Sequence, residues 1–232
     1  MIDLNKIKPE HLWYFIGLIV TDGNLSKDCR HITLTSKDRE HLFLVQKAMG
    51  LKGTIGRKAR GGSQDKIYST LQFSDVTFYK FLQSIGITTK KSLTLGQIKF
   101  ESKYFNDFIR GVIDGDGCIT KWKHKSNGLT QWALGIVSAS PIFINWLKYE
   151  IENHFGVKGK LYSYAPKTKE NQMNSLKFGK LAGKIILSHV YYKNCLGLER
   201  KILKCNQCLL DKNRMIKYGS VICPSAEIGR QP

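Results

Sequence analysis

The sequence has few acidic residues and no apolar segment long enough to cross a membrane. Lys and Arg number 37 against 18 Asp and Glu, so the 232-residue chain has a formal net charge of +19. Its longest apolar run, residues 12–20, falls well short of the roughly 20 residues that span a bilayer, and acidic residues precede it. We therefore expect an intracellular protein with no membrane partner and no secretory segment. So much positive charge predicts a polyanionic partner, because solubility alone needs far less.

The sequence also has no cysteine framework. Its six cysteines follow no repeating spacing, and without a secretory signal they should stay reduced. Cys205 and Cys208 form a lone C-x-x-C, whereas a structural zinc needs a second ligand pair, for which only the isolated Cys195 and Cys223 are near. The surrounding segment has helical periodicity, which favours buried thiols in a helix over a zinc site.

What the sequence does contain is an internal repeat. Residues 15–23 read FIGLIVTDG and residues 109–117 read IRGVIDGDG. Each copy is an apolar run with an early glycine that ends in Asp-Gly, and a polar, strand-like stretch follows it. A repeat decides the architecture before other signals do. This one predicts two similar halves that each contribute one carboxylate, Asp22 and Asp116.

Hydrophobic periodicity predicts the same order of elements in both halves: helix, two strands, helix, two strands, helix. The expected helices span residues 9–21, 39–49, 76–85, 104–115, 142–154, 181–191 and 199–212. The expected strands span residues 25–27, 31–36, 54–60, 66–74, 119–123, 131–138, 158–164 and 175–178. We place the first half at residues 1–87, a linker at 88–102, the second half at 103–218 and a flexible tail at 219–232. Gly23 is expected in the left-handed conformation that ends many helices.

Small residues are spaced so that the two repeat helices can touch. Gly111 and Gly115 are four residues apart and therefore lie on one helix face, and Gly17 and Thr21 have the same offsets. A stripe of small residues lets two backbones approach closely. We expect these four residues to form the interface between the helices, which would bring the helix C-terminal ends side by side.

Two carboxylates at adjoining helix ends would repel each other. The helix C-terminus is itself partly negative, so Asp22 and Asp116 need a cation between them. Oxygen ligands suit Mg²⁺ better than zinc. The alternative is that both Asp-Gly pairs are only turns that end their helices.

With these motifs the chain resembles the LAGLIDADG homing endonucleases, in the single-chain form with two motifs. The resemblance covers nearly the whole chain. It implies an α+β fold of two pseudo-symmetric αββαββα halves, each with a curved antiparallel four-stranded sheet, packed through the two motif helices. It also implies that Asp22 and Asp116, at the eighth motif position, are catalytic and bind Mg²⁺, with Mn²⁺ as a substitute.

The chain departs from the family pattern at the sixth motif position. That position is commonly acidic, and here it is Val20 in the first copy and Asp114 in the second. We therefore expect Asp114 to have a structural role. Family members also place basic residues beside the metal sites, and Lys91 and Lys201 are our candidates for that catalytic role, with solvated lysines as the alternative.

The family's sheets bind the major groove of DNA, and strand alternation selects the side chains that face away from the core. The expected DNA-binding residues are His31, Thr33, Thr35, Arg57, Lys58, Arg60, Tyr68, Thr70, Gln72, Lys121, Lys123, Lys125, Gln131, Lys167, Ser175 and Lys177. The face of Lys121 and Lys123 is left open because Ile119 shares their parity. Any one of the basic residues can instead be a solvated charge.

The resemblance implies a monomer that cleaves double-stranded DNA at a long asymmetric target site, with a staggered cut and a role in intron homing. Two alternatives stay open. One is an RNA maturase that binds host intron RNA, and the other is a non-cleaving DNA-binding regulator on the same scaffold. A basic scaffold for protein partners would leave the paired motif unexplained.

Overall fold

The computed structural model describes residues 2–60, 63–165 and 172–211. The first half contains η1 (Leu4–Lys6), α1 (Pro9–Asp22), β1 (Gly23–Leu25), β2 (His31–Ser36), α2 (Arg39–Ala48), β3 (Thr54–Arg60), β4 (Ser63–Ser74) and α3 (Val76–Ser84). Between the halves lie α4 (Lys91–Thr94) and η2 (Ser102–Tyr104). The second half contains α5 (Phe105–Asp116), β5 (Gly117–Lys123), β6 (Thr130–Ser138), α6 (Pro141–Phe155), β7 (Lys160–Tyr164), β8 (Met173–Phe178), α7 (Lys180–Val190) and α8 (Glu199–Leu210).

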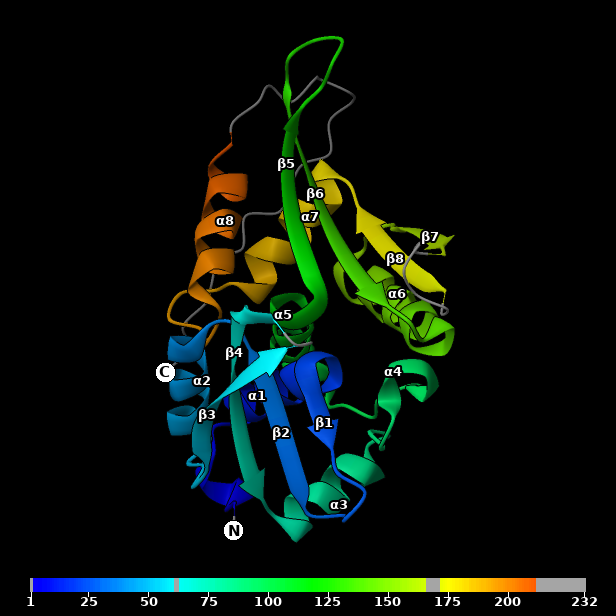
Figure 1. Ribbon diagram of the computed structural model, residues 1–232. Coiled ribbons are helices and arrows are strands. Elements are labelled where there is room, and N and C mark those ends of the chain that lie inside the picture. Colours follow the sequence, from blue (N-terminus) through cyan, green and yellow to red (C-terminus); the bar gives the residue numbers. More distant parts are fainter. Residues whose placement is uncertain (1, 61–62, 166–171, 212–232) are drawn as a thin grey trace, which may run out of the picture.

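The two halves repeat one topology. The strand order is β1-β2-β4-β3 in the first sheet and β5-β6-β8-β7 in the second, and all the pairings are antiparallel. The two sheets lie on either side of the central helices α1 and α5 (Figure 1). The predicted α+β fold, with two similar halves packed through the motif helices, is confirmed.

The helices α1 and α5 cross at two glycines. A Cβ added to Gly17 would lie 2.3 Å from the carbonyl oxygen of Phe108, and one added to Gly111 would lie 2.2 Å from the carbonyl oxygen of Tyr14. The two Cα positions are mutual neighbours as well, since each added Cβ would lie 2.9 Å from the other glycine's Cα. The crossing therefore brings backbone against backbone, a distance that no larger residue permits.

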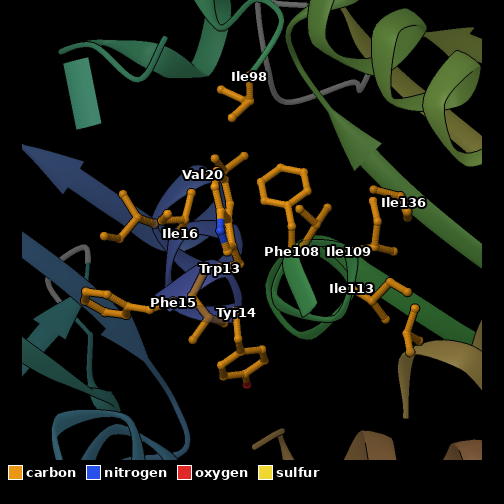
Figure 2. Packing of buried hydrophobic residues seen from close by; sticks show 14 of the residues in the cluster. Trp13, Tyr14, Phe15, Ile16, Val20, Ile98, Phe108, Ile109, Ile113 and Ile136 are labelled. Carbon is orange, nitrogen blue, oxygen red and sulfur yellow. The ribbon is translucent and has the colours of Figure 1, made fainter. Parts of the chain in front are cut away.

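Each motif helix is buried on nearly all sides, and in α5 the buried residues include the charged Asp107, Arg110 and Asp114. Phe15 and Ile16 extend toward the first half, whereas Ile109 and Ile113 extend toward the second (Figure 2). All four side chains are fully buried. The interface and the two sheet cores are thus one continuous apolar cluster.

Gly23 does not adopt the predicted left-handed conformation. Its φ is −83° and its ψ is 157°, and Gly117 has nearly the same values, so both residues start strands directly after a helix. The reason for glycine is close packing instead. A Cβ would lie 2.6 Å from the Cα of Ile19 at the first position and 2.5 Å from the carbonyl oxygen of Ile113 at the second.

Asp114 is a buried structural residue that joins the two halves. Its side chain is 3% exposed and accepts hydrogen bonds from the Tyr14 hydroxyl at 2.7 Å, the Tyr191 hydroxyl at 2.5 Å and the backbone N–H of Leu198 at 2.8 Å. The Tyr14 hydroxyl also lies 2.6 Å from Nε2 of His41. Burial and the neighbouring carboxylate raise the pKa of both tyrosines well above the usual value.

We expect Asp114→Asn to lower the free energy of unfolding by about 2 kcal/mol, because a buried acceptor of three hydrogen bonds loses its charge and one of its two acceptor oxygens. Denaturant unfolding followed by fluorescence measures the change. The exposed Asp3→Asn variant, which carries the same chemical change, is the control. An Asp114→Asn protein as stable as this control would contradict the structural role.

The predicted boundaries differ from the structure mainly at the starts of strands. β1, β5 and β8 each start two residues earlier than expected, β4 starts three residues earlier, and β7 starts two residues later. In addition, α4 lies inside the segment assigned to a linker. The division into residues 1–87, 88–102 and 103–218 stays a prediction, and the predicted tail at 219–232 lies outside the described residues. No helix in the described part of the chain has the length and apolar character needed to cross a membrane.

Candidate functional site

The two acidic residues of the repeat lie at adjoining helix ends. Asp22 is the last residue of α1, Asp116 is the last residue of α5, and both are exposed. A Cβ added to Gly115 would lie 1.9 Å from Oγ1 of Thr21 and 3.2 Å from Oδ2 of Asp22, so the two ends pack against each other. Desolvation of the carboxylate by surrounding atoms and the negative charge of Asp116 raise the pKa of Asp22 from 3.8 to about 6.

Lys91 lies directly beside this pair of acids. Its amine donates a hydrogen bond to the carbonyl oxygen of Thr21 at 3.1 Å, and the residue is only 6% exposed. Burial lowers its pKa to about 8, although the charges of Asp116 and Asp22 act in the opposite direction. A cation at a helix C-terminus is favourable because the last carbonyl groups are partly negative.

Lys201 likewise donates hydrogen bonds to backbone carbonyl oxygens at the end of α5, and it has more partners than Lys91. Its amine donates to the carbonyl oxygens of Asp114 and Gly117, each at 2.8 Å, and to that of Ile113. The residue is 5% exposed, and burial lowers its pKa to about 8. The structure therefore places both predicted lysines at the adjoining helix ends, where they bind backbone carbonyl groups.

Two hollows open beside the acids. The larger, of about 600 Å³, contains Asp22 together with the polar residues Thr35, Ser36, Lys37, Asp38, Tyr68, Lys91, Ser92 and Arg200. The smaller, of about 310 Å³, contains Asp116 and is lined by polar residues such as Thr21 and Ser138 and by the apolar residues Val20, Leu95, Val137, Phe143 and Met173. Lys91 and Ser92 border both hollows, so the start of α4 lies beside both acids.

The open face of the first sheet gathers most of the DNA-binding residues predicted for this half. Cross-strand register places Thr33 opposite Gln72 and Thr35 opposite Thr70. A third hollow, of about 760 Å³, lies over this face and is lined by residues that include His31, Thr33, Thr35, Arg57, Thr70 and Gln72. Tyr68 instead borders the hollow of Asp22, where Nζ of Lys37 lies 5.6 Å from the centre of its ring.

Three predicted contacts cannot be placed in full. Lys167 lies outside the described residues, and the side chains of Lys58 and Arg60 are not described although their backbone belongs to β3. Arg57 is exposed and borders the hollow over the first sheet, yet it pairs with the buried Ser69. By register it therefore lies on the helix-facing side of β3.

The register of the second sheet shows on which side of β5 two of the predicted lysines lie. Lys121 pairs with the buried Trp132 and Lys123 lies two residues further along β5, so both share the helix-facing side with Ile119. Nζ of Lys121 lies 5.3 Å from the centre of the Trp132 ring. The face that the sequence left open for these two lysines is thus the helix-facing one by strand parity, and their contact with DNA stays a prediction.

The remaining predicted residues of this half divide between the open face and the hairpin turn. Gln131 and Lys177 lie on the open face by register, and Lys125 is exposed in the turn of the β5–β6 hairpin, which projects at one end of the molecule (Figure 1). Ser175 also has open-face register but is only 6% exposed. The side chain of Ser175 is therefore buried, which argues against a direct contact between Ser175 and DNA.

The prediction missed several residues of this surface. Trp122, Tyr162 and Tyr164 are exposed, and the parity of Ile119 already indicated that Trp122 faces outward. Nζ of Lys177 lies 5.3 Å from the centre of the Tyr162 ring. At the hollow of Asp22, the prediction also missed Arg200. It chose the adjacent Lys201 as the basic residue beside the acids, and no local sequence signal distinguishes the two residues.

The C-x-x-C pair forms no metal-binding cluster with other residues that the structure describes. Cys205 and Cys208 are buried on α8, as the helical periodicity predicted. No cluster of three or more His, Cys, Asp or Glu residues suited to a metal occurs among the described residues. Cys223 lies outside them. Asp22 and Asp116 therefore offer an oxygen-only pair of donors that is open to solvent.

Comparison with known proteins places this geometry in a family context. A family model described as a LAGLIDADG-like domain matches residues 9–86, and no curated protein matches the sequence. The structure resembles the homing endonuclease I-WcaI bound to its DNA recognition sequence, with a TM-score of 0.59 at 13% identity over 86% of this chain and 87% of that one. The chain thus resembles the LAGLIDADG proteins in both motif and fold.

Two further structures share the fold. Full-length DUF199/WhiA from Thermatoga maritima matches with a TM-score of 0.56 at 14% identity over 91% of this chain; the match spans 62% of that longer protein. A mesophilic variant of the homing endonuclease I-DmoI matches with a TM-score of 0.53 at 13% identity over 85% of this chain and 97% of that one. Identities this low show the fold alone.

Proposed function

We propose that this protein is a site-specific endonuclease that cleaves both strands of double-stranded DNA. The observation that carries the proposal is the pair Asp22 and Asp116, exposed at adjoining helix ends between two similar halves. Each acid borders a different hollow. This arrangement agrees with one acid acting on one phosphodiester bond in each DNA strand. The net charge of +19 supports a nucleic-acid substrate.

The donor set of this site fits Mg²⁺, with Mn²⁺ as a substitute. Asp22 and Asp116 offer only carboxylate oxygens, which Mg²⁺ prefers, and DNA phosphates and water can supply the remaining ligands. When bound, such an ion activates water for attack on phosphorus and stabilises the leaving oxygen. The chain itself holds the two carboxylates in place through Lys91 and Lys201, which fix the ends of α1 and α5.

The open sheet faces are suited to the DNA on either side of the cleavage point. Thr33, Thr35 and Gln72 of the first sheet, and Gln131 and Lys177 of the second, present donors and acceptors of the kind that read base edges and phosphates. The two faces carry different side chains. A single chain with two unlike faces would act as a monomer on a long asymmetric target, as expected for an enzyme of intron homing.

The fold alone does not assign cleavage, because the similar structures match at only 13–14% identity. A DNA-binding regulator that does not cleave is the second candidate, and an RNA maturase on the same scaffold is a third. The presence of both acids in open hollows favours the endonuclease, since neither acid is needed for binding alone.

A selection on randomised DNA tests the proposal directly. The full chain is used to recover bound duplexes from a random library without divalent metal, and Mg²⁺ or Mn²⁺ is then added to the recovered complex. We expect both strands to be cut at a fixed position with a stagger, which sequencing of the ends would show. Recovered duplexes that stay intact with either metal would identify a non-cleaving binding protein instead.

The affinity for Mg²⁺ is expected to fall steeply as the pH drops below about 6. The pKa of Asp22 is about 6 rather than 3.8, so a proton competes with the metal and the apparent affinity falls about tenfold for each pH unit below it. Thermal melts with and without Mg²⁺ between about pH 5 and 8 measure this. A Mg²⁺-induced shift in Tm that persists undiminished at about pH 5 would contradict the assignment of Asp22.

Without metal, the same pKa has a consequence of opposite sign. The folded pKa lies above the unfolded one, so the protonated form is favoured in the folded state and ionisation of Asp22 opposes folding. Asp22→Asn should therefore raise the Tm measured without metal. The increase should be complete at pH values above about 6 and absent below about pH 4. The exposed Glu101→Gln variant, which removes the same charge elsewhere, should show no such window.

A further inference from the structure

Arg200 stands at the hollow of Asp22 in an arrangement that leaves it available to a ligand. It belongs to the first turn of α8, and its Nε lies 3.3 Å from Oδ2 of Asp38. Its side chain is 58% exposed. Ion pairs with this exposure contribute about 0–1 kcal/mol, so exchange of the carboxylate for another anion costs little.

The neighbouring Lys201 has no such availability. Its three N–H groups donate to three backbone carbonyl oxygens, and only 5% of the residue is exposed. A contact between Lys201 and DNA would break bonds that fix the end of α5. Its amine therefore holds the helix that carries Asp116, and it cannot at the same time bind a substrate phosphate.

The partner chemistry of Arg200 follows from its guanidinium group. That group presents five donors in a planar arrangement that matches a phosphate with two parallel hydrogen bonds. Lys37 lines the same hollow and is exposed, which adds a second positive charge beside Asp22. The hollow thus combines an acid able to hold a metal with cations able to hold the phosphate next to it.

We propose that Arg200 is the residue of the second half that contacts a DNA phosphate at the Asp22 hollow, and that Lys201 is a positioning residue. The part of this inference that concerns cleavage rests on the function proposed above. Arg200 lines the hollow of Asp22 and does not occur among the described residues that line the hollow of Asp116. Its contribution is therefore specific to one of the two DNA strands.

The test uses a duplex recovered by binding selection, with each strand labelled separately. In single-turnover cleavage with Mg²⁺, Arg200→Gln should slow one strand about tenfold or more and leave the other within about twofold, so that nicked DNA accumulates. Without divalent metal, the plot of log affinity against log salt concentration should become less steep, by about 0.9, the amount that one phosphate contact contributes. Arg39→Gln removes the same charge from the exposed side of α2 and should change neither rate.

Lys201→Met provides the contrasting variant. Loss of three hydrogen bonds at the end of α5 should lower Tm and slow both strands alike, while the salt slope stays as in the wild type. A Lys201→Met protein with an unchanged Tm and a reduced salt slope would place the phosphate contact on Lys201 and overturn the assignment.

The outcomes separate this inference from the proposed function. If the wild type binds but never cleaves, the endonuclease proposal fails, and the salt slope of Arg200→Gln still decides whether Arg200 contacts a phosphate. If the wild type cleaves while Arg200→Gln keeps both strand rates and the salt slope, the inference is wrong and the function stands. Equal slowing of both strands by Arg200→Gln would also overturn it.

Discussion

Cleavage should be lost, by about a hundredfold or more, in Asp22→Asn and in Asp116→Asn, while the affinity for DNA stays close to that of the wild type. Asparagine keeps the size of each side chain and removes the charge that a divalent metal requires. Both acids are exposed, so the exchange leaves no buried group without a partner. Strand-resolved cleavage of a selected duplex, together with binding measured without metal, tests both parts.

The double variant makes the strongest case. With neither carboxylate charged, adjoining helix ends no longer offer a ligand set for Mg²⁺, and neither strand should be cut. Glu101→Gln is a matched control, because Glu101 forms an exposed pair with Lys103 that contributes little. Full cutting by the double variant would remove the catalytic assignment, and loss of DNA binding would point to a structural role for the acids.

The second large effect is expected at the helix crossing. Gly111→Ala places a Cβ 2.2 Å from the Tyr14 carbonyl oxygen and 2.9 Å from the Cα of Gly17, and both neighbours are backbone atoms that no rotamer change can move. Overpacking of this kind costs about 1–3 kcal/mol, and leucine at this position should cost more. The helices must separate, which displaces Asp22 relative to Asp116, and small displacements cost about a hundredfold in rate.

Gly96→Ala is the appropriate comparison, because a Cβ at Gly96 would meet no heavy atom within 4 Å. Thermal melts and cleavage rates of both variants, with far-ultraviolet circular dichroism to confirm that each is folded, complete the test. A Gly111→Ala protein with the wild-type Tm and rate would mean that the paired acids do not depend on close contact of the two helices.

The sequence was informative where one pattern occurred twice. The repeat predicted the two halves, and the shared offsets of Gly17 and Gly111 predicted which helices would meet. Strand alternation placed Thr33 and Gln72 on the open face of the first sheet. These features depend on local periodicity, which a chain displays regardless of its tertiary contacts.

Features that depend on distant partners could not be predicted in this way. Whether Arg200 or Lys201 faces the Asp22 hollow depends on how α8 meets the end of α5, and the two residues are adjacent in the sequence. Gly23 follows a helix, which local rules read as a left-handed cap, whereas contact with the preceding turn decided its conformation. The parity of Lys121 was visible, but only the pairing with Trp132 showed which face is buried.

The hydrogen bond between Tyr14 and Asp114 makes the contact between the halves selective. In the repeat, Tyr14 corresponds to Phe108 and Asp114 corresponds to Val20. Two copies of the first half would set the Tyr14 hydroxyl against a valine, and two copies of the second would set a buried carboxylate against a phenylalanine. Either mismatch removes one hydrogen bond from a buried group that keeps its partners within its own half, such as His41 for Tyr14 and Tyr191 for Asp114, and the loss of a bond to a charged group costs about 1.5–3 kcal/mol. Only unlike halves form this bond, so the interface discourages self-pairing between chains through exposed motif helices during folding.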